Sequence, residues 1–311
     1  MPRRHLDLGD AVTPLVAVVG PTAVGKSALA VDLALAVDGE VVNADSMQLY
    51  VGMDIGTAKI AVPERLGVPH HLLDLWPVTR TASVAEYQER ALAVVAAIRG
   101  RGRVPILVGG SGLYVHALVD RWDFPGTDPQ IRAALEAELA DLGPEALHER
   151  LARRDPEAAA SIDSGNGRRL VRALEVGQLG GSFSARLPEI TDDAGVVLLG
   201  LTLPRPDLDA RVEARVGGMW DDGLVDEVRG LVDQGLRDGR TASRALGYAQ
   251  VLRFLDGDTT EQQARKTTVQ ATRRFVRRQE SWFRRDPRIR WLPADDVDLL
   301  GQAVGRVARQ P

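Results

Sequence analysis

The segment that most clearly carries chemistry is a glycine-rich loop near the start of the sequence. Residues 20–27 read GPTAVGKS and match the phosphate-binding pattern G-x-x-x-x-G-K-[ST]. In such a loop, backbone N–H groups turn inward around phosphate oxygens, and the following helix directs its positive dipole end at them. Lys26 is expected to contact the terminal phosphates, and the Ser27 hydroxyl is expected to bind Mg²⁺. The predicted phosphate-binding residues are Gly20, Pro21, Thr22, Ala23, Val24, Gly25, Lys26 and Ser27.

The loop by itself specifies only the class of ligand. It indicates an anionic di- or triphosphate and leaves nucleotide binding, including ATP binding, open. ATPases that act as motors also carry an apolar strand that ends in Asp or Asp-Glu. The best candidate for such a strand, residues 104–108 (VPILV), is followed by Gly-Gly-Ser instead. This difference argues against a motor, whereas a small-molecule kinase remains an alternative.

Two further polar residues follow apolar runs of the same kind. Asp45 ends the run VVNAD, where a carboxylate is well placed to accept a proton from an attacking nucleophile. Capping of the next turn explains an Asp at this position equally well. Ser111 lies in the turn GGSG, where its simplest role is the N-cap of a following helix. Its hydroxyl helps to hold an acceptor base only if these turns and the phosphate loop converge.

The elements around these turns are expected to bring them together. Short apolar strands are predicted at residues 15–19, 41–42 and 104–108, and helices at 26–37 and 84–99. The second helix begins behind the capping box Ser83–Glu86. Strands that alternate with helices indicate a parallel sheet covered on both faces, with its ligands at the carboxyl ends of the strands. The three suspected turns, 20–27, 43–48 and 109–112, all lie at such ends.

The pattern changes in the middle of the chain. From Trp122 to Gly195 we find amphipathic helical stretches separated by Pro and Gly, and a strand-like run, VVLLGLTL, then resumes at residues 196–203. We therefore predict an α/β fold with a P-loop NTPase-like core, residues 1–121 and 196–311, and an inserted all-helical domain, residues 122–195. Two consecutive domains are the alternative, which the returning strand disfavours. Long helical stretches are predicted at 207–235 and 259–285, and a late strand at 288–292.

A basic stretch lies near the end of the chain. Its cations are Arg265, Lys266, Arg273, Arg274, Arg277, Arg278, Arg284, Arg285, Arg288 and Arg290, opposed within the stretch only by Glu280 and Asp286. A solvated helix face is the simpler explanation of a charge run. The scarcity of acidic neighbours favours a surface that binds the phosphodiester backbone of nucleic acid.

The composition sets limits on the class of protein. The chain has 311 residues, a net charge of −4 and no cysteine, so disulfides and Cys-ligated metals are excluded and a cytoplasmic location is expected. No apolar run approaches the roughly 18 residues needed to span a bilayer. The first residues, MPRRHLDLGDAVTP, lack the apolar core of a signal peptide. We therefore expect no membrane partner.

Several segments together are similar to one enzyme family. They are GPTAVGKS (20–27), NADSMQLYVGMDIGTAK (43–59), PHHLLD (69–74), LVGGSGLY (107–114), GRRLVRALEV (167–176), RALGY (244–248) and RRFVRRQESWFRRD (273–286). In this order the chain resembles bacterial tRNA dimethylallyltransferases, the IPP transferase family. The departures are small: Ser27 and Ser111 stand where Thr is common, Ile60 where Pro is common, and residues 181–195 form a short segment.

The resemblance implies a reaction. The donor is dimethylallyl diphosphate, whose pyrophosphate binds the loop, Lys26 and Mg²⁺ on Ser27. The acceptor is the exocyclic amine of the adenine next to the 3′ side of the anticodon. Asp45 accepts the proton of that amine, Ser111 orients the base, and the loop with Lys26 stabilises the departing pyrophosphate. Arg215 is a further candidate for that last task. No ATP is needed.

The resemblance also implies a tRNA-binding surface for the anticodon stem-loop. The residues that would face the tRNA are Asp45, Ser46, Met47, Gln48, Ser111, Arg132, Arg168, Arg169, Leu170, Val171, Arg172, Arg244, Ala245, Leu246, Gly247 and Tyr248. Reaching the adenine requires turning it out of its stack. A monomer suffices for this arrangement.

Three other functions remain open at the level of sequence. A nucleoside or metabolite kinase explains the loop but leaves the basic helices without a role. A nucleotide-gated RNA-binding protein explains both but assigns no chemistry to Asp45. Prenylation of free adenine nucleotides explains the core but not the segments expected to face RNA.

Overall fold

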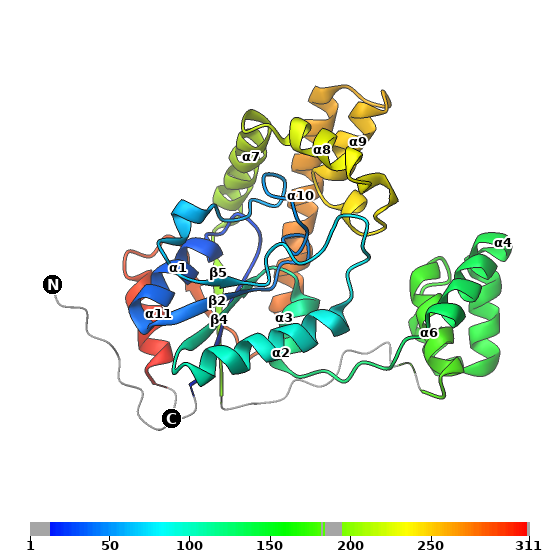
Figure 1. Cartoon of the computed structure of the whole chain (residues 1–311), viewed down its shortest axis with the longest axis horizontal. Coiled ribbons are helices and arrows are strands. Elements are labelled where there is room, and N and C mark those ends of the chain that lie inside the picture. Colours follow the sequence, from blue (N-terminus) through cyan, green and yellow to red (C-terminus); the bar gives the residue numbers. More distant parts are fainter. Residues whose placement is uncertain (1–12, 182, 184–194, 310–311) are drawn as a thin grey trace. The chain divides into compact units, whose positions relative to one another are not determined.

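The computed structural model of the protein describes residues 13–181, 183 and 195–309 (Figure 1). The chain forms two compact units, one of residues 1–121 with 191–311 and one of residues 122–190. The first twelve residues, where we expect no signal peptide, and most of the short segment 181–195 lie outside the described residues. Among the described residues, no helix is long and apolar enough to cross a membrane.

The first unit is built on a parallel sheet of six strands in the order β3-β2-β4-β1-β5-β6. The strands are β1 (Leu15–Val19), β2 (Gly39–Asn43), β3 (His70–His71), β4 (Val104–Gly109), β5 (Val196–Thr202) and β6 (Arg290–Pro293). β1 pairs with β4 on one side and with β5, about 180 residues later in the chain, on the other. Since β5 follows the helical unit and returns to the same sheet between β1 and β6, the predicted α/β fold with a P-loop-like core is confirmed.

Helices cover both faces of this sheet (Figure 1). Alternate residues of β1 point to opposite faces, Val16 and Val18 to one and Ala17 and Val19 to the other. The first face packs against α1 (Lys26–Val37) and α11 (Leu299–Val307), and the second against α2 (Val84–Gly100) and α3 (Gly112–Val119). Burial of each valine contributes roughly 1.5–3 kcal/mol. The predicted helices at 26–37 and 84–99 are confirmed, and Ser83 caps the second by accepting the N–H of Glu86.

Four further helices of the first unit pack against one another (Figure 1). They are α7 (Arg205–Asp221), α8 (Leu224–Asp233), α9 (Tyr248–Leu255) and α10 (Glu261–Phe283). Short 3₁₀ turns occur at Val62–Arg65, Leu236–Asp238 and Ala242–Arg244. The stretch 207–235, predicted as one helical region, is two helices, because Gly223 adopts a left-handed conformation with φ of 97° between them.

The second unit is helical throughout its described part. It consists of α4 (Pro129–Arg154), which is broken at Gly143, α5 (Pro156–Ser161) and α6 (Gly167–Gln178). Leu147, Leu151, Leu170 and Leu174 are among the buried residues of its own hydrophobic core. The unit therefore has an interior of its own.

Candidate active site

The phosphate-binding loop has the context that its sequence predicts, with β1 before it and α1 after it. Gly25 precedes the first residue of α1 at a φ of 107°, a conformation that side-chain-bearing residues rarely adopt. The Nζ atom of Lys26 donates a hydrogen bond to the carbonyl oxygen of Pro21 at 2.7 Å. The lysine side chain is thus folded back over the loop.

Charged side chains from three elements lie within electrostatic range of one another at the loop. Burial, the largest cause, and the charge of Arg215 together lower the pKa of Lys26 to about 7, against the opposing effect of the charge of Asp45. Burial likewise lowers the pKa of Arg215, which Asp45 again opposes. Lys26 begins α1, Arg215 lies on α7 and Asp45 follows β2. Two partly desolvated cations beside one carboxylate form a site suited to an additional anion.

Asp45 is held firmly in the turn after β2. Its Oδ1 atom accepts the N–H of Met47 at 2.9 Å. Its own N–H is accepted by Oδ1 of Asn43 at 2.9 Å, and its carbonyl oxygen accepts a bond from Nδ2 of Asn43 at 3.0 Å. Asp45 therefore caps its turn, which was one of the two roles considered for it. Among the described residues, Oδ2 accepts no hydrogen bond, so one oxygen remains for a substrate.

Ser111 does not use its side chain in the way that a lone N-cap serine would. It occupies the N-cap position of α3, but its hydroxyl caps no backbone N–H of that helix. The hydroxyl oxygen instead accepts the N–H of Ser46 at 3.1 Å and lies 3.2 Å from Oγ of Ser46. The simple capping interpretation is wrong, because the hydroxyl ties the turn 109–112 to the turn 43–48.

Gln279 connects the third turn, and sequence reasoning missed it. This buried side chain on α10 accepts the N–H of Thr22 at 2.9 Å and donates to the carbonyl oxygen of Gly110 at 2.9 Å. It therefore fastens the phosphate loop to the turn that carries Ser111. The only sequence feature that could have pointed to Gln279 is its uncharged amide side chain within an arginine-rich helix. With this link, the predicted convergence of the three turns is confirmed.

Arg215 and Gln48 share one backbone acceptor. Nη2 of Arg215 lies 3.1 Å from the carbonyl oxygen of Thr57, and Nε2 of Gln48 lies 3.2 Å from the same atom. Ser46, Met47 and Gln48 are half-buried. The turn after Asp45 is thus joined to the loop of residues 53–59, which carries no predicted site residue.

Some residues predicted to face tRNA have buried side chains. Leu170 and Val171 are part of the hydrophobic core of the helical unit, and Ala245 and Tyr248 are part of the core of the first unit. The side chains of these four residues are packed in the interior, and the assignment of these positions to the tRNA-binding surface stays a prediction. Leu246 is half-buried and Gly247 is buried, whereas Arg168, Arg169 and Arg244 are exposed.

Two other predicted tRNA contacts are arginines held by a buried carboxylate. Glu175 of α6 is fully buried and accepts hydrogen bonds from Arg132 and Arg172, and from the N–H of Asp128 at 3.1 Å. Arg172 also donates to the carbonyl oxygens of Pro125 and Gly126. Arg132 and Arg172 therefore join the start of α4 to α6, whether or not they also contact RNA.

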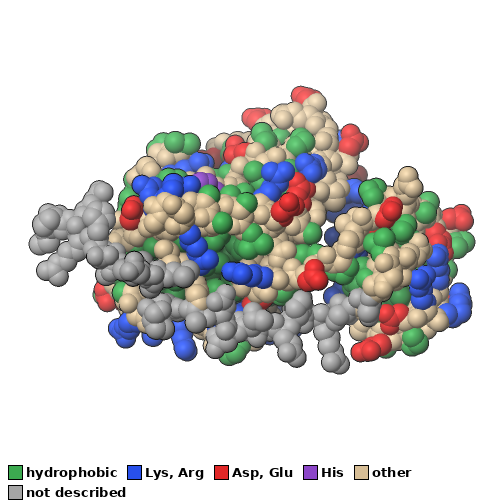
Figure 2. All heavy atoms as spheres, turned by 60° about the horizontal axis from the view of Figure 1, so that its bottom comes forward, with side chains coloured by type: hydrophobic (Ala, Val, Ile, Leu, Met, Phe, Trp, Pro, Cys, Tyr) green, Lys and Arg blue, Asp and Glu red, His purple; other side chains and the backbone are tan. Residues whose placement is uncertain are grey.

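The basic helix α10 is less free of acidic partners than its sequence suggests. Arg273 of α10 pairs with Glu213 of α7 at 2.8 Å, and Arg288, which follows α10, pairs with the distant Asp120 at 2.8 Å as well as with the neighbouring Asp286. Arg274, Arg277 and Arg278 are exposed and, within the described residues, form no ion pair. On the face in Figure 2, Lys and Arg side chains form several separate groups. Arg265 and Lys266, near the start of α10, are likewise exposed and form no ion pair within the described residues, so the unpaired charge of α10 lies at 265–266 as well as at 274–278.

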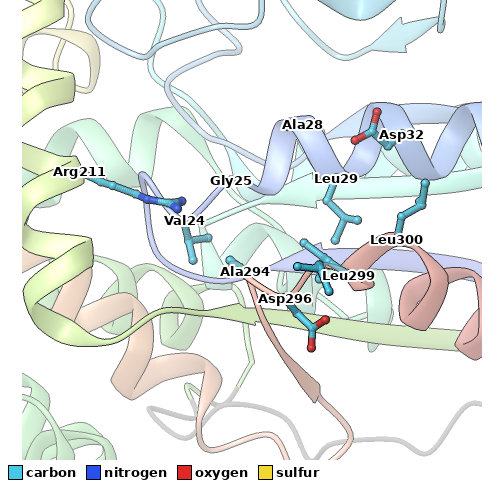
Figure 3. Close-up of a pocket in the computed structure, with 11 residues that line it drawn as sticks. Val24, Gly25, Ala28, Leu29, Asp32, Arg211, Ala294, Asp296, Leu299 and Leu300 are labelled. Carbon is cyan, nitrogen blue, oxygen red and sulfur yellow. The ribbon is translucent and has the colours of Figure 1, made fainter.

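A pocket of about 370 Å³ borders the phosphate loop on the side of α1 and α11 (Figure 3). Its lining includes Gly25, Leu29 and Leu300, and Arg211 reaches toward the loop from α7. The pocket does not include Lys26, Asp45 or Ser111. It therefore borders the loop without being the place where the predicted catalytic residues meet.

A magnesium ion at the loop requires oxygen ligands from the protein. No cluster of three or more His, Cys, Asp or Glu side chains suited to a metal occurs among the described residues. The Ser27 hydroxyl at the start of α1 is exposed. Mg²⁺ in phosphate-transfer sites commonly takes one or two protein oxygens together with phosphate oxygens and water. Ser27 therefore fits as the protein ligand of a magnesium ion whose other ligands are phosphate oxygens of the substrate and water.

Comparisons with known proteins agree on one family. The family model described as IPP transferase matches residues 48–286. A tRNA dimethylallyltransferase of Thermobifida fusca is 62% identical over 302 residues, which cover 95% of each chain. The solved structure of the full-length tRNA isopentenylpyrophosphate transferase of Bacillus halodurans is 40% identical, covers 96% of this chain and 98% of its own, and has a TM-score of 0.71. A eukaryotic dimethylallyltransferase solved acting on tRNA shares the fold, with a TM-score of 0.77 at 23% identity.

Proposed function

The chain belongs to the IPP transferase family, and from this premise we propose that it transfers the dimethylallyl group of dimethylallyl diphosphate to an adenine amine in tRNA. The adenine is the one adjacent to the 3′ side of the anticodon, and the product released is pyrophosphate. The relative from Thermobifida fusca, with coverage of 95% of both chains, carries the name of this activity.

One observation in the structure carries the proposal. Ser111 accepts the N–H of Ser46, and Ser46 follows Asp45 directly, so a carboxylate and a hydroxyl are fixed together beside the phosphate loop. A kinase or motor needs a phosphate site and a metal site. A carboxylate with an unoccupied oxygen and a nearby hydroxyl suit an acceptor with an N–H group and ring nitrogens.

The reaction assigns a role to each of these groups. The nitrogen of the exocyclic amine attacks the allylic carbon that carries the diphosphate, and a new C–N bond forms as the C–O bond breaks. The bonding electrons leave with the pyrophosphate. The amine is a poor nucleophile because its lone pair is delocalised into the ring, so Asp45 accepts its proton as the bond forms. The Ser111 hydroxyl contacts the same base and restricts its orientation.

The loop stabilises the leaving group in this proposal. Lys26, Arg215 and the backbone N–H groups of residues 23–27 face the negative charge that develops on the pyrophosphate. When bound, Mg²⁺ supplies additional positive charge to the phosphate oxygens, and Ser27 is the residue that would hold it. Burial, together with the charge of Arg215, lowers the pKa of Lys26 to about 7, and the negative charge of a bound diphosphate favours its protonated form.

The tRNA is recognised through its anticodon stem-loop in the same proposal. Extrusion of the adenine from its stack brings its amine to Asp45. Arg274, Arg277 and Arg278 contact phosphates, as do the exposed Arg168, Arg169 and Arg244. Ser46, Met47, Gln48 and Ser111 lie next to the base. The enzyme works as a monomer in the cytoplasm.

A comparison of acceptors tests the proposal. The protein is incubated with ¹⁴C-labelled dimethylallyl diphosphate and Mg²⁺, and with either unmodified tRNA, AMP or no acceptor. We expect label in the tRNA alone. Label in AMP but not in tRNA would support prenylation of free nucleotides. In a parallel incubation with γ-³²P-labelled ATP and the same acceptors, phosphoryl transfer without prenyl transfer would support a kinase.

A further inference from the structure

Glu227 of α8 binds three consecutive backbone amides of a distant loop. Its Oε2 atom accepts the N–H of Asp54 at 3.0 Å and that of Ile55 at 2.6 Å. Its Oε1 atom accepts the N–H of Gly56 at 3.1 Å and the hydroxyl of Tyr248. Consecutive amides that point to one place form an anion-binding concavity. In this protein the side chain of Glu227 occupies that concavity.

The loop is pressed closely against the helices that hold it. A Cβ atom at Gly56 would lie 2.4 Å from Cε2 of Tyr248 and 2.8 Å from Cδ1 of Leu224, so the contact leaves no room for a side chain. Burial raises the pKa of Tyr248, as does the neighbouring Glu227. The tyrosine hydroxyl therefore remains protonated and donates to the carboxylate.

The next residue in this loop positions two groups of the site. The hydroxyl of Thr57 donates to the carbonyl oxygen of Met53 at 2.7 Å, which fixes the direction of the following peptide. The carbonyl oxygen of Thr57 then accepts the bonds from Arg215 and Gln48. The chain of contacts runs from Glu227 through residues 54–57 to Arg215 on the phosphate side and to Gln48 on the base side.

We propose that Glu227 is a positioning residue that sets Arg215 and Gln48 through the 54–57 loop. This inference rests on the proposed function for the role of Gln48, whereas the effect on Arg215 concerns phosphate binding alone. Loss of one carboxylate oxygen as an acceptor leaves a loop amide unpaired, and the Thr57 carbonyl then no longer holds the Arg215 guanidinium in place. Glu227 itself touches no reacting atom.

The first test is the affinity of the protein for pyrophosphate, measured by isothermal titration calorimetry. We expect Glu227→Gln to weaken binding about tenfold, the effect of one lost charge-assisted hydrogen bond. Asp226→Asn is the matched control, because the neighbouring Asp226 is exposed, lies on the same helix and pairs only with Arg229 among the described residues. This control is expected to change the dissociation constant less than twofold.

A double-mutant cycle separates positioning from a general loss of structure. In an Arg215→Ala background, Glu227→Gln is expected to add less than a twofold effect, because the group through which it acts is gone. Equal effects of Glu227→Gln in both backgrounds would overturn the proposal, as would an unchanged affinity in the single variant. If Glu227→Gln does not fold, Tyr248→Phe removes one donor and keeps the carboxylate. That variant is then expected to weaken binding in the same direction, again only where Arg215 is present.

A second measurement reports on the base side. In the prenyl-transfer assay, Glu227→Gln is expected to raise KM for tRNA at least threefold. In a Gln48→Ala background, the same substitution is expected to cause no further rise in KM. Independent contributions of the two residues would contradict the link to Gln48. Wild-type protein that binds pyrophosphate but transfers no prenyl group would refute the proposed function. The double-mutant cycle of Glu227 and Arg215, measured by pyrophosphate binding, would then still decide the role of Glu227.

Discussion

The hydroxyl oxygen of Ser111 lies 3.1 Å from the backbone nitrogen of Ser46, although 65 residues separate them in the chain. This bond joins the turn after β4 to the turn after β2. It fixes the distance between the Ser111 hydroxyl and the carboxylate of Asp45, which precedes Ser46. In the proposed reaction, the two groups that act on the base are thereby held together before the base binds.

Replacement of Asp45 by Asn separates its two roles. The amide oxygen of Asn keeps an acceptor for the N–H of Met47, so the turn is preserved, but an amide does not accept a proton. We expect the turnover rate to fall by roughly 10²- to 10⁴-fold while pyrophosphate affinity stays within about threefold of wild type. Single-turnover prenyl transfer and calorimetry measure the two quantities. Full activity of the Asp45→Asn variant would show that Asp45 only caps its turn and does not accept a proton.

The affinity of the loop for pyrophosphate is expected to depend on pH through Lys26. Its pKa is lowered from 10.5 to about 7, so the ammonium charge is present below pH 7 and is lost as the pH rises through that value. Binding should therefore weaken above pH 7. Lys26→Arg stays charged, so the comparison cancels the titration of pyrophosphate itself. Parallel pH profiles of the two proteins would show that Lys26 is protonated throughout.

The same shift has a consequence for folding. Between about pH 7 and 10.5 the unfolded chain binds the Lys26 proton more tightly than the folded protein does. The contribution of Lys26 to the free energy of unfolding therefore rises with pH across this interval. Urea unfolding of the wild type and of Lys26→Met at both ends of the interval isolates this contribution.

Gln279 is expected to be needed for both stability and activity. Gln279→Ala leaves the N–H of Thr22 and the carbonyl oxygen of Gly110 without their partner, at a cost of about 1–3 kcal/mol per unsatisfied group. The loop and the Ser111 turn then move independently, and kcat/KM should fall at least tenfold per folded molecule. Gln270→Ala, at an exposed position of the same helix, is the control. Equal activity of the two variants would show that the link only stabilises the fold.

Three of the unpaired cations of α10, Arg274, Arg277 and Arg278, are expected to account for much of the salt dependence of tRNA binding. Each phosphate contact removed should lower the slope of log affinity against log salt by about one. The variant with Ala at Arg274, Arg277 and Arg278 is compared with Arg90→Ala, an exposed arginine that pairs with Glu86. Filter binding from low to high salt provides both slopes. Identical slopes for the triple variant and wild type would show that these three arginines face solvent and do not contact tRNA phosphates.

Much of the core could be predicted from the sequence because its signals are local. The glycine loop, the capping serine at 83 and the apolar runs of β1 and β4 each depend on neighbouring residues. Gln279 and Glu227 escaped prediction because their partners lie 257 and about 172 residues away, and neither residue type is distinctive. The distant acids that pair with Arg273 and Arg288 were missed for the same reason. Residues 170, 171 and 248 were assigned to RNA by motif, whereas helical periodicity and packing direct them inward.

In the proposed reaction, the loop holds a pyrophosphate that departs while an adenine amine receives the prenyl group. Dimethylallyl diphosphate carrying ¹⁴C in the prenyl group and ³²P in the diphosphate tests it in one reaction with unmodified tRNA. We expect ¹⁴C to enter the tRNA and ³²P to appear as free pyrophosphate in equal amounts. Digestion should place the ¹⁴C on a single adenine 3′ of the anticodon. Transfer of ³²P to the RNA, or ³²P release without ¹⁴C in the tRNA, would contradict the account.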